Sequence, residues 1–258
     1  MKRSLSILDN MEILSFNGKV NKFPDHYHES FCISIIEEGT EIIKMGNKKL
    51  YTTKGNVSIS NPLEVHSNPL FDENTSHKFK TIYLSPDLVN NIIGQKQIGF
   101  NNFQESSNSV GELINKICCD AKNDNTEEIE EDLKTILLSL NINNKYEPNN
   151  FDQVKGKWLD LLNYIDLNIS KRITVQTLSK IIHIESTYFI KQFKLKFGLT
   201  PINYVLMKKI YAAKNEIVKD IPISSIAYAY GFTDLPHFSN TFKRFIGISP
   251  LEYKKMKT

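Results

Sequence analysis

The fold of the C-terminal half is decided by GFTDLPHFSNTFKRFIGISPLEYKK, residues 231–255. A glycine begins this stretch, and a second glycine and Pro250 close it, as residues that stop helices do. Between them Phe238, Phe242 and Phe245 recur at spacings of three and four, which predicts an amphipathic helix with one apolar side. A single helix leaves open whether its polar side is simply solvated or is held against a partner.

A related pattern lies 48 to 49 positions earlier in the chain. Residues 174–200 and 222–249 both contain a short helix, a tight turn, a polar cap and a longer helix with aromatic residues spaced by four. The two copies end as KLKFGLTP and KRFIGISP. Each copy therefore predicts a helix-turn-helix motif, one at about 174–197 and the other at about 223–245.

The outward side of each second helix carries polar and basic residues. Residues near the start of such a helix reach base edges in the major groove, and those further along meet phosphates. The helix expected between the copies, 201–219, is about 28 Å long, close to one DNA turn of ~34 Å. The candidate DNA-contacting residues are Thr187, Ile190, Lys191 and Lys194 in the first copy and Leu235, Pro236, His237, Ser239, Asn240 and Lys243 in the second.

Charge is distributed unevenly along the chain. Residues 151–258 contain 17 Lys and Arg against 8 Asp and Glu, whereas residues 1–150 contain 15 against 21. A basic C-terminal part joined to an acidic N-terminal part indicates that a polyanion such as double-stranded DNA binds to one half only.

The second copy, GFTDLPHFSNTFKRFIGISPLEY, and the preceding KKIYAAKNEIVKDIPISSIAYAYGF resemble the DNA-binding domain of the AraC/XylS family of bacterial transcription regulators. The resemblance covers residues 154–258, and Lys209 stands where the family often has Arg. It implies base contacts at Thr187, Ile190 and Lys191 of the first recognition helix, and at Leu235, Pro236, His237, Ser239 and Asn240 of the second. Ile190 and the Leu235-Pro236 pair are apolar where polar readers are common, and apolar groups can contact thymine methyls.

The N-terminal half changes from strand to helix periodicity. Short apolar runs separated by turn signals over residues 11–84 predict an antiparallel sandwich or barrel. Helices are expected at 85–93, 109–122 and 126–142. The last helix either packs on its own domain or forms a dimer interface through an apolar stripe of Ile129, Leu133, Ile136, Leu137 and Leu140.

A polar, Asn-rich linker is expected at 141–153, because this stretch lacks either hydrophobic period. It separates a domain at 1–145 from an all-helical domain at 154–258 with about seven helices. The expected fold class is two-domain α+β, an antiparallel cupin-like barrel with trailing helices followed by an all-α domain. The seven segments are expected at roughly 154–168, 174–182, 186–197, 201–219, 223–230, 234–245 and 249–256.

The segment PDHYHESFCISIIEEG, with VSISNPLEVHS downstream, resembles a small cupin barrel, as in the sensory half of many members of this family. His26, His28 and His66 have the arrangement of the three histidines of metal-binding cupins. The Glu that usually follows the second His is replaced by Cys32 and Ile33, so an enzymatic ligand set is incomplete. Three interpretations stay open: a metal-free effector pocket of His26, His28, Cys32 and His66, a three-His metal site, or histidines that only pack.

The sequence thus predicts a sequence-specific transcription regulator without enzymatic activity or cofactor. A small-molecule effector in the barrel would bias dimerisation or the disposition of the DNA-binding domains. The resemblance favours an activator, whose partners would include a second copy of the chain and RNA polymerase. One alternative is a metal-dependent cupin enzyme with a DNA-binding appendage, and another is an architectural DNA-binding protein that needs no effector.

The sequence predicts neither a membrane span nor a signal peptide. No apolar run reaches the ~18–20 residues that a spanning helix needs, and no apolar segment follows Lys2 and Arg3. Three cysteines, two of them adjacent, make a poor disulfide framework. We therefore expect a protein of the reducing cytoplasm.

Overall fold

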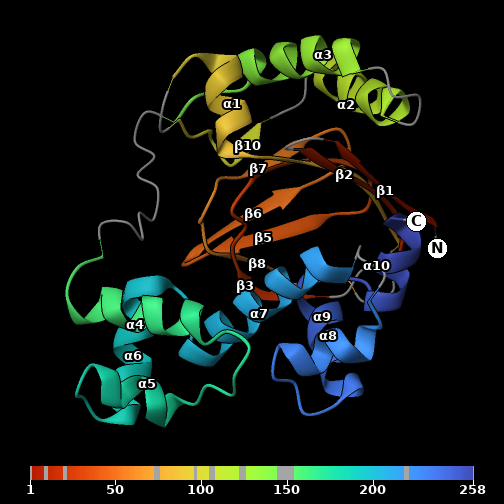
Figure 1. Ribbon diagram of the computed structural model, residues 1–258. Helices are drawn as coiled ribbons and strands as arrows, with labels where there is room; N and C mark the ends of the chain where they lie inside the picture. The colour runs from red at the N-terminus through yellow and green to blue at the C-terminus, as the bar shows by residue number, and fades with distance from the viewer. Residues whose placement is uncertain are drawn as a thin grey trace. The chain divides into compact units, whose positions relative to one another are not determined.

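The computed structural model describes residues 2–8, 11–19, 22–72, 76–95, 98–104, 108–121, 126–143, 154–217 and 221–257 (Figure 1). The chain divides into two compact units, Met1–Lys22 with Tyr27–Asn149 and Phe23–His26 with Asn150–Thr258. The linker expected at 141–153 lies mostly outside the described residues, so the exact domain boundary stays a prediction.

The N-terminal half of the chain is built on antiparallel strand pairs, as the sequence predicts. Six strands form one sheet in the order β1-β2-β9-β4-β7-β10, and a second sheet has the order β3-β8-β5-β6 (Figure 1). The strands are β1 (Lys2–Leu8), β2 (Met11–Gly18), β3 (Phe23–His26), β4 (Phe31–Glu38), β5 (Glu41–Met45), β6 (Lys48–Thr52), β7 (Val57–Ser60), β8 (His66–Asn68), β9 (His77–Leu84) and β10 (Phe103–Gln104).

The strands β1 and β10 lie outside the range in which the sequence predicts strands. β1 pairs with β2 along its whole length, from Lys2 opposite Asn17 to Leu8 opposite Met11. β10 has two residues, which pair with Ser58 and Val57 of β7. Both strands are defined by their hydrogen-bonded partners, because neither contains a run of apolar residues long enough to be recognised locally.

Three helices cover one face of the six-stranded sheet (Figure 1). They are α1 (Pro86–Ile93), α2 (Asn108–Asp120) and α3 (Thr126–Ser139), close to the expected ranges. The start of α1 is fixed by Ser85, whose side chain accepts a hydrogen bond from the Leu88 N–H at 3.2 Å. Residues of the sheet such as Ile33, Ile59 and Ile82 form one hydrophobic core with the helices.

The apolar stripe of α3 packs inside this core. All five of its members, Ile129, Leu133, Ile136, Leu137 and Leu140, are buried there. Of the two interpretations of the stripe, packing on its own domain is therefore the correct one. A dimer that used α3 would have to use the opposite side of the helix.

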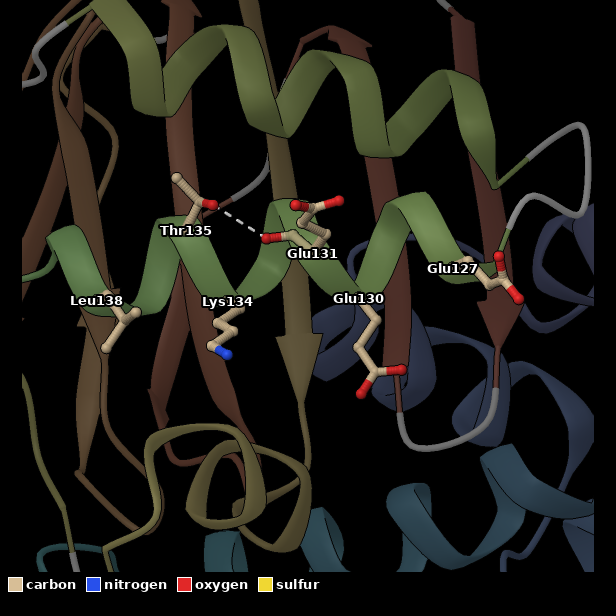
Figure 2. Close-up of a pocket in the computed structure, with 6 residues that line it drawn as sticks. All are labelled: Glu127, Glu130, Glu131, Lys134, Thr135 and Leu138. Carbon is tan, nitrogen blue, oxygen red and sulfur yellow. Dashed lines mark hydrogen bonds between the residues drawn. The ribbon is translucent and has the colours of Figure 1, made fainter.

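The opposite side of α3 forms an acidic surface pocket, which Figure 2 shows. Leu138 is 63% exposed at one end, and the Thr135 hydroxyl donates to the carbonyl oxygen of Glu131 at 3.0 Å. The pocket is lined by Glu127, Glu130, Glu131, Lys134, Thr135 and Leu138. Since small-molecule sites are mostly apolar, this lining does not favour an effector site.

The second unit contains the seven helices that the sequence predicts. They are α4 (Lys157–Leu167), α5 (Val175–Ile181), α6 (Ser186–Phe197), α7 (Pro201–Ile217), α8 (Ile223–Ala229), α9 (Leu235–Ile246) and α10 (Pro250–Lys257). Among the described residues, no helix has the length and hydropathy that a bilayer crossing requires.

Two aromatic clusters form the core of this unit, one for each motif. In the first, Trp158 of α4 and Tyr204 of α7 pack on three buried rings of α6, Phe189, Phe193 and Phe197. In the second, Phe232 packs on Phe238, Phe238 on Phe242, and Phe242 on Tyr253 of α10. The aromatic spacing in the sequence therefore encodes core packing in both motifs.

The turns of the two motifs repeat the same backbone geometry 48 residues apart. His183 and Gly231 both have a left-handed φ, of 56° and 70°. The N–H of the next residue then reaches back in the same way, from Ile184 to the Ser179 carbonyl at 3.2 Å and from Phe232 to the Ala227 carbonyl at 3.0 Å. The internal repeat thus corresponds to two helix-turn-helix motifs, α5–α6 and α8–α9.

Candidate functional site

The recognition helices α6 and α9 both begin at an acidic cap. The Glu185 carboxylate accepts hydrogen bonds from the N–H groups of Thr187 at 2.7 Å and Tyr188 at 2.9 Å. Asp234 accepts one from the His237 N–H at 2.6 Å. These backbone hydrogen bonds hold the pKa of both carboxyl groups below their usual values. Ionised caps therefore fix the first turn of each recognition helix at neutral pH.

The predicted DNA-contacting residues lie outside the buried aromatic cores, although the His237 ring packs against Phe232 with the two centroids 5.2 Å apart. Ile190 and Ser239 are partly buried. The other eight are exposed: Thr187, Lys191, Lys194, Leu235, Pro236, His237, Asn240 and Lys243. The two recognition helices thus leave a polar and basic surface in solvent, and DNA contact by these residues stays a prediction.

Two further exposed residues of these helices were not among the candidates predicted from the sequence. Tyr188 is 54% exposed in the first turn of α6, beside Thr187. Arg244 is exposed in the last turn of α9, where its guanidinium donates to the Asn203 side-chain oxygen at 3.2 Å. The sequence could have indicated both, because Tyr188 directly follows Thr187 and Arg244 directly follows Lys243, two residues already assigned to the outward side.

The first unit holds a second candidate site, on the side of the six-stranded sheet that faces away from α1–α3. Side chains alternate between the two faces of a strand, and Ile33, Ile59 and Ile82 point to the helices. Their neighbours Cys32, Ser34, Ser58, Thr81 and Tyr83 therefore point to the opposite side. The Ser34 and Thr81 hydroxyls share a hydrogen bond there at 2.7 Å.

A carboxylate of the second sheet faces this polar surface. Glu41 of β5 accepts from the Ser58 hydroxyl at 2.8 Å and from the Asn68 side-chain amide at 3.2 Å. Burial raises the pKa of the Glu41 carboxyl. Thr52 is directly opposite Glu41 on β6, is fully buried, and its hydroxyl has no hydrogen-bond partner among the described residues. Sequence reasoning missed this cluster because pairing across the two sheets creates it.

The predicted effector residues come together in part. His28 lies near the middle of an aromatic group, with its ring centroid 5.3 Å from that of His66 and 5.5 Å from that of Tyr83. Cys32 is buried and lies opposite Tyr83 in the strand register. One nitrogen of each of the three histidines, His26 included, lies within 4.8 Å of the others.

The three histidines have a chemistry that fits a transition metal. The Nδ1 atoms of His26 and His66 lie 2.8 Å from the backbone carbonyls of Pro24 and Glu64. Because a carbonyl only accepts, Nδ1 must carry the proton, and Nε2 is the ligand nitrogen of the neutral ring. The side chain of Glu64 accepts from Asn61 and Asn102 instead. Among the described residues, the group of possible metal ligands thus consists of three imidazoles.

Known proteins are similar to both halves of the chain. Residues 10–138 match the family model of the "AraC-like ligand binding domain", and residues 178–256 match that of the "Helix-turn-helix domain". The "Probable transcriptional regulator LumQ" of Photobacterium leiognathi is 34% identical over 137 residues, which are 49% of this chain and 55% of LumQ. The alignment thus spans about half the length of that relative.

Two further proteins align with nearly all of the chain. The "HTH-type transcriptional activator RhaS" of Yersinia pestis (strain Pestoides F) is 25% identical over 251 residues, 90% of this chain and 89% of RhaS. The crystal structure of unsaturated fatty acid-bound wild-type ToxT from Vibrio cholerae strain SCE256 has a TM-score of 0.57, with 13% identity over 99% of this chain and 98% of ToxT. At this identity the ToxT likeness is one of fold.

The ligand-domain match covers half of the chain and falls on the first unit, and the helix-turn-helix match falls on the second. Both halves therefore point to one group of proteins, and the chain belongs to the AraC/XylS family of transcription regulators.

Proposed function

We propose that this chain is a sequence-specific DNA-binding transcription activator of the cytoplasm, controlled by a small molecule. The observation that carries the proposal is the pair of helix-turn-helix motifs, whose recognition helices expose basic and polar residues while their phenylalanines are buried. Asn and His side chains on such a surface read base edges, and the lysines bind phosphates.

Sequence-specific binding is tested by a selection from random DNA with the full-length chain. We expect one site to be enriched, and single base-pair changes within it to cost about 1–3 kcal/mol each. Affinities are measured by fluorescence anisotropy at one fixed salt concentration. Scrambled DNA that bound equally well at that salt would instead support the architectural DNA-binding alternative.

The effector is proposed to bind in the polar interior of the first unit. A group of hydrogen-bonding side chains lies where an ordinary core would be apolar. It contains Glu41 with its partners Ser58 and Asn68, and Thr52, whose hydroxyl has no hydrogen-bond partner among the described residues. Such a group suits a small ligand with hydroxyl or amino donors. His28 and Tyr83 add aromatic rings on the same interior surface.

Thermal melting of the full-length chain tests the effector and its class. Among sugars, polyols and amines, we expect a ligand that raises the melting temperature, since about 100 times its Kd adds about 2.7 kcal/mol. The variant Glu41→Gln is expected to lose most of that shift. The matched control Glu38→Gln changes an exposed carboxylate at the end of β4 and keeps the shift. An equal shift in both variants contradicts the role of Glu41.

A metal-dependent site is the second candidate, favoured by the convergence of His26, His28 and His66. Metal analysis of the purified chain separates it from the effector proposal, which expects no stoichiometric metal. Stoichiometric zinc, iron or manganese that is lost in His28→Ala would support the metal-dependent alternative. A shift produced by an unsaturated fatty acid alone would contradict the polar class of effector.

A homodimer and RNA polymerase are the protein partners that we propose. The exposed side of α3 carries Glu127, Glu130 and Glu131, so an acidic surface is what this helix offers to a partner. Sedimentation of the full-length chain with and without selected DNA measures the oligomeric state.

A further inference from the structure

Lys209 lies in the middle of α7, the helix that connects the two motifs, and is buried. It is 4% exposed, and burial lowers its pKa to about 8. Its helix neighbours Met207 and Ile210 are fully buried apolar residues. Placing an ammonium group among them costs free energy unless the group is hydrogen-bonded. The partners of the amino group therefore explain why a lysine is present.

One of those partners lies just before the first motif and the other lies within the second motif. The Lys209 Nζ donates to the carbonyl oxygen of Lys171 at 2.7 Å and to that of Tyr230, also at 2.7 Å. Lys171 belongs to the segment that leads into α5, the first helix of the first motif. Tyr230 is the C-terminal cap of α8, the first helix of the second motif. One amino group of α7 thus joins the segment that enters the first motif to the end of α8 in the second motif.

The same junction explains a glycine. A Cβ atom on Gly231 would lie 2.7 Å from the Ser170 carbonyl oxygen and 3.0 Å from the Lys209 Nζ. The equivalent turn position of the first motif, His183, has the same left-handed φ but is exposed and carries a side chain. Close approach of the segment before the first motif, rather than the turn geometry alone, therefore requires glycine at 231.

The junction joins parts that otherwise have separate aromatic cores. The rings that pack on Phe193 belong to the first motif and its flanking helices, and those that pack on Phe242 belong to the second motif and to α10. We propose that Lys209 is a positioning residue that locks the two helix-turn-helix motifs into one rigid reader of DNA. This inference rests on the proposed DNA-binding function and adds that the spacing of the two half-sites is fixed by the junction.

The test compares a complete selected site with altered versions of it, using the full-length chain. One version has a single half-site with the other half scrambled, and another has two base pairs inserted between the halves. The insertion turns the second half-site by about 70° around the duplex. For the wild-type chain we expect the insertion to lower the affinity to that of the single half-site.

The variant Lys209→Met keeps the apolar stem and removes the donors. We expect it to lose about ten-fold in affinity for the complete site and to bind the single half-site like the wild type. The loss of affinity caused by the two inserted base pairs should therefore be smaller for this variant than for the wild type. Lys209→Arg retains donors and is expected to restore the complete-site affinity. The matched control Lys208→Met removes a charge from the next position, where Lys208 pairs with Asp166 at 3.1 Å, and should change both affinities by the same factor.

An unchanged ratio of complete-site to half-site affinity in Lys209→Met overturns the proposal, and so does a wild-type chain that tolerates the insertion. The insertion measurement uses the wild-type chain, so it tests whether the half-site spacing is fixed even if Lys209→Met does not fold. Gly231→Ala then tests the same junction and is expected to lower the ratio. If no sequence is enriched from the pool, the regulator proposal fails instead, which is a different outcome.

Discussion

The variant Phe193→Ala is expected to lower the free energy of unfolding of the second unit by about 3–5 kcal/mol. Phe193 is fully buried, and its ring centroid lies 4.5 Å from that of Phe197, 5.5 Å from that of Tyr204 and 6.3 Å from that of Trp158. Removing the ring leaves a cavity that these rigid neighbours fill poorly. The chain has one tryptophan, so urea unfolding followed by Trp158 fluorescence reports on this cluster directly.

Leu195→Ala on the same helix is the control. Leu195 is 80% exposed, and its truncation should change the free energy of unfolding by no more than about 0.5 kcal/mol. Equal effects of the two variants would mean that the aromatic cluster does not stabilise the first motif.

The variant Asn240→Ala is expected to weaken binding by about 1–3 kcal/mol on the selected site and to relax the preference at particular base pairs. Asn240 is exposed on α9, three positions before Lys243. The comparison variant Lys243→Ala should weaken binding evenly on all sequences and reduce the slope of log affinity against log salt by about 1. Competition experiments with single-base variants of the site, repeated at several salt concentrations, measure both effects.

A uniform loss on every sequence for both variants would remove Asn240 from the base-reading set. A position-specific loss for Lys243→Ala would extend that set further along the helix.

The helices of this protein follow from local signals in the sequence. Thr174 caps α5 by accepting from the Thr177 N–H, and Gly198 and Gly247 end α6 and α9 in the left-handed conformation. Such caps and stops involve neighbouring residues, so the sequence predicts them within a few positions. The strand β1 depends on pairing with β2, a partner that local periodicity does not reveal.

The residues of the candidate sites divide in the same way, into those that local periodicity predicts and those whose role depends on distant partners. The exposure of Thr187 and Lys191 follows from the period of a helix whose aromatic side is visible in the sequence. Glu41 and Lys209 acquire their roles from partners 17 and 38 residues away in the chain. A single sequence contains no signal for such pairings, since a Glu or a Lys in isolation is expected at the surface.

The acidic caps give each recognition helix a fixed electrical polarity. Glu185 and Asp234 place a negative charge at the start, and Lys194 with Lys196, or Lys243 with Arg244, place positive charges at the end. The N–H groups of the first turn, which in other proteins hold a phosphate, are occupied by the protein's own carboxylates. We therefore expect a DNA backbone to be repelled by the N-terminal ends of both helices and attracted by their C-terminal ends. We expect this polarity to favour one orientation of the duplex and to leave the N-terminal ends to uncharged base edges.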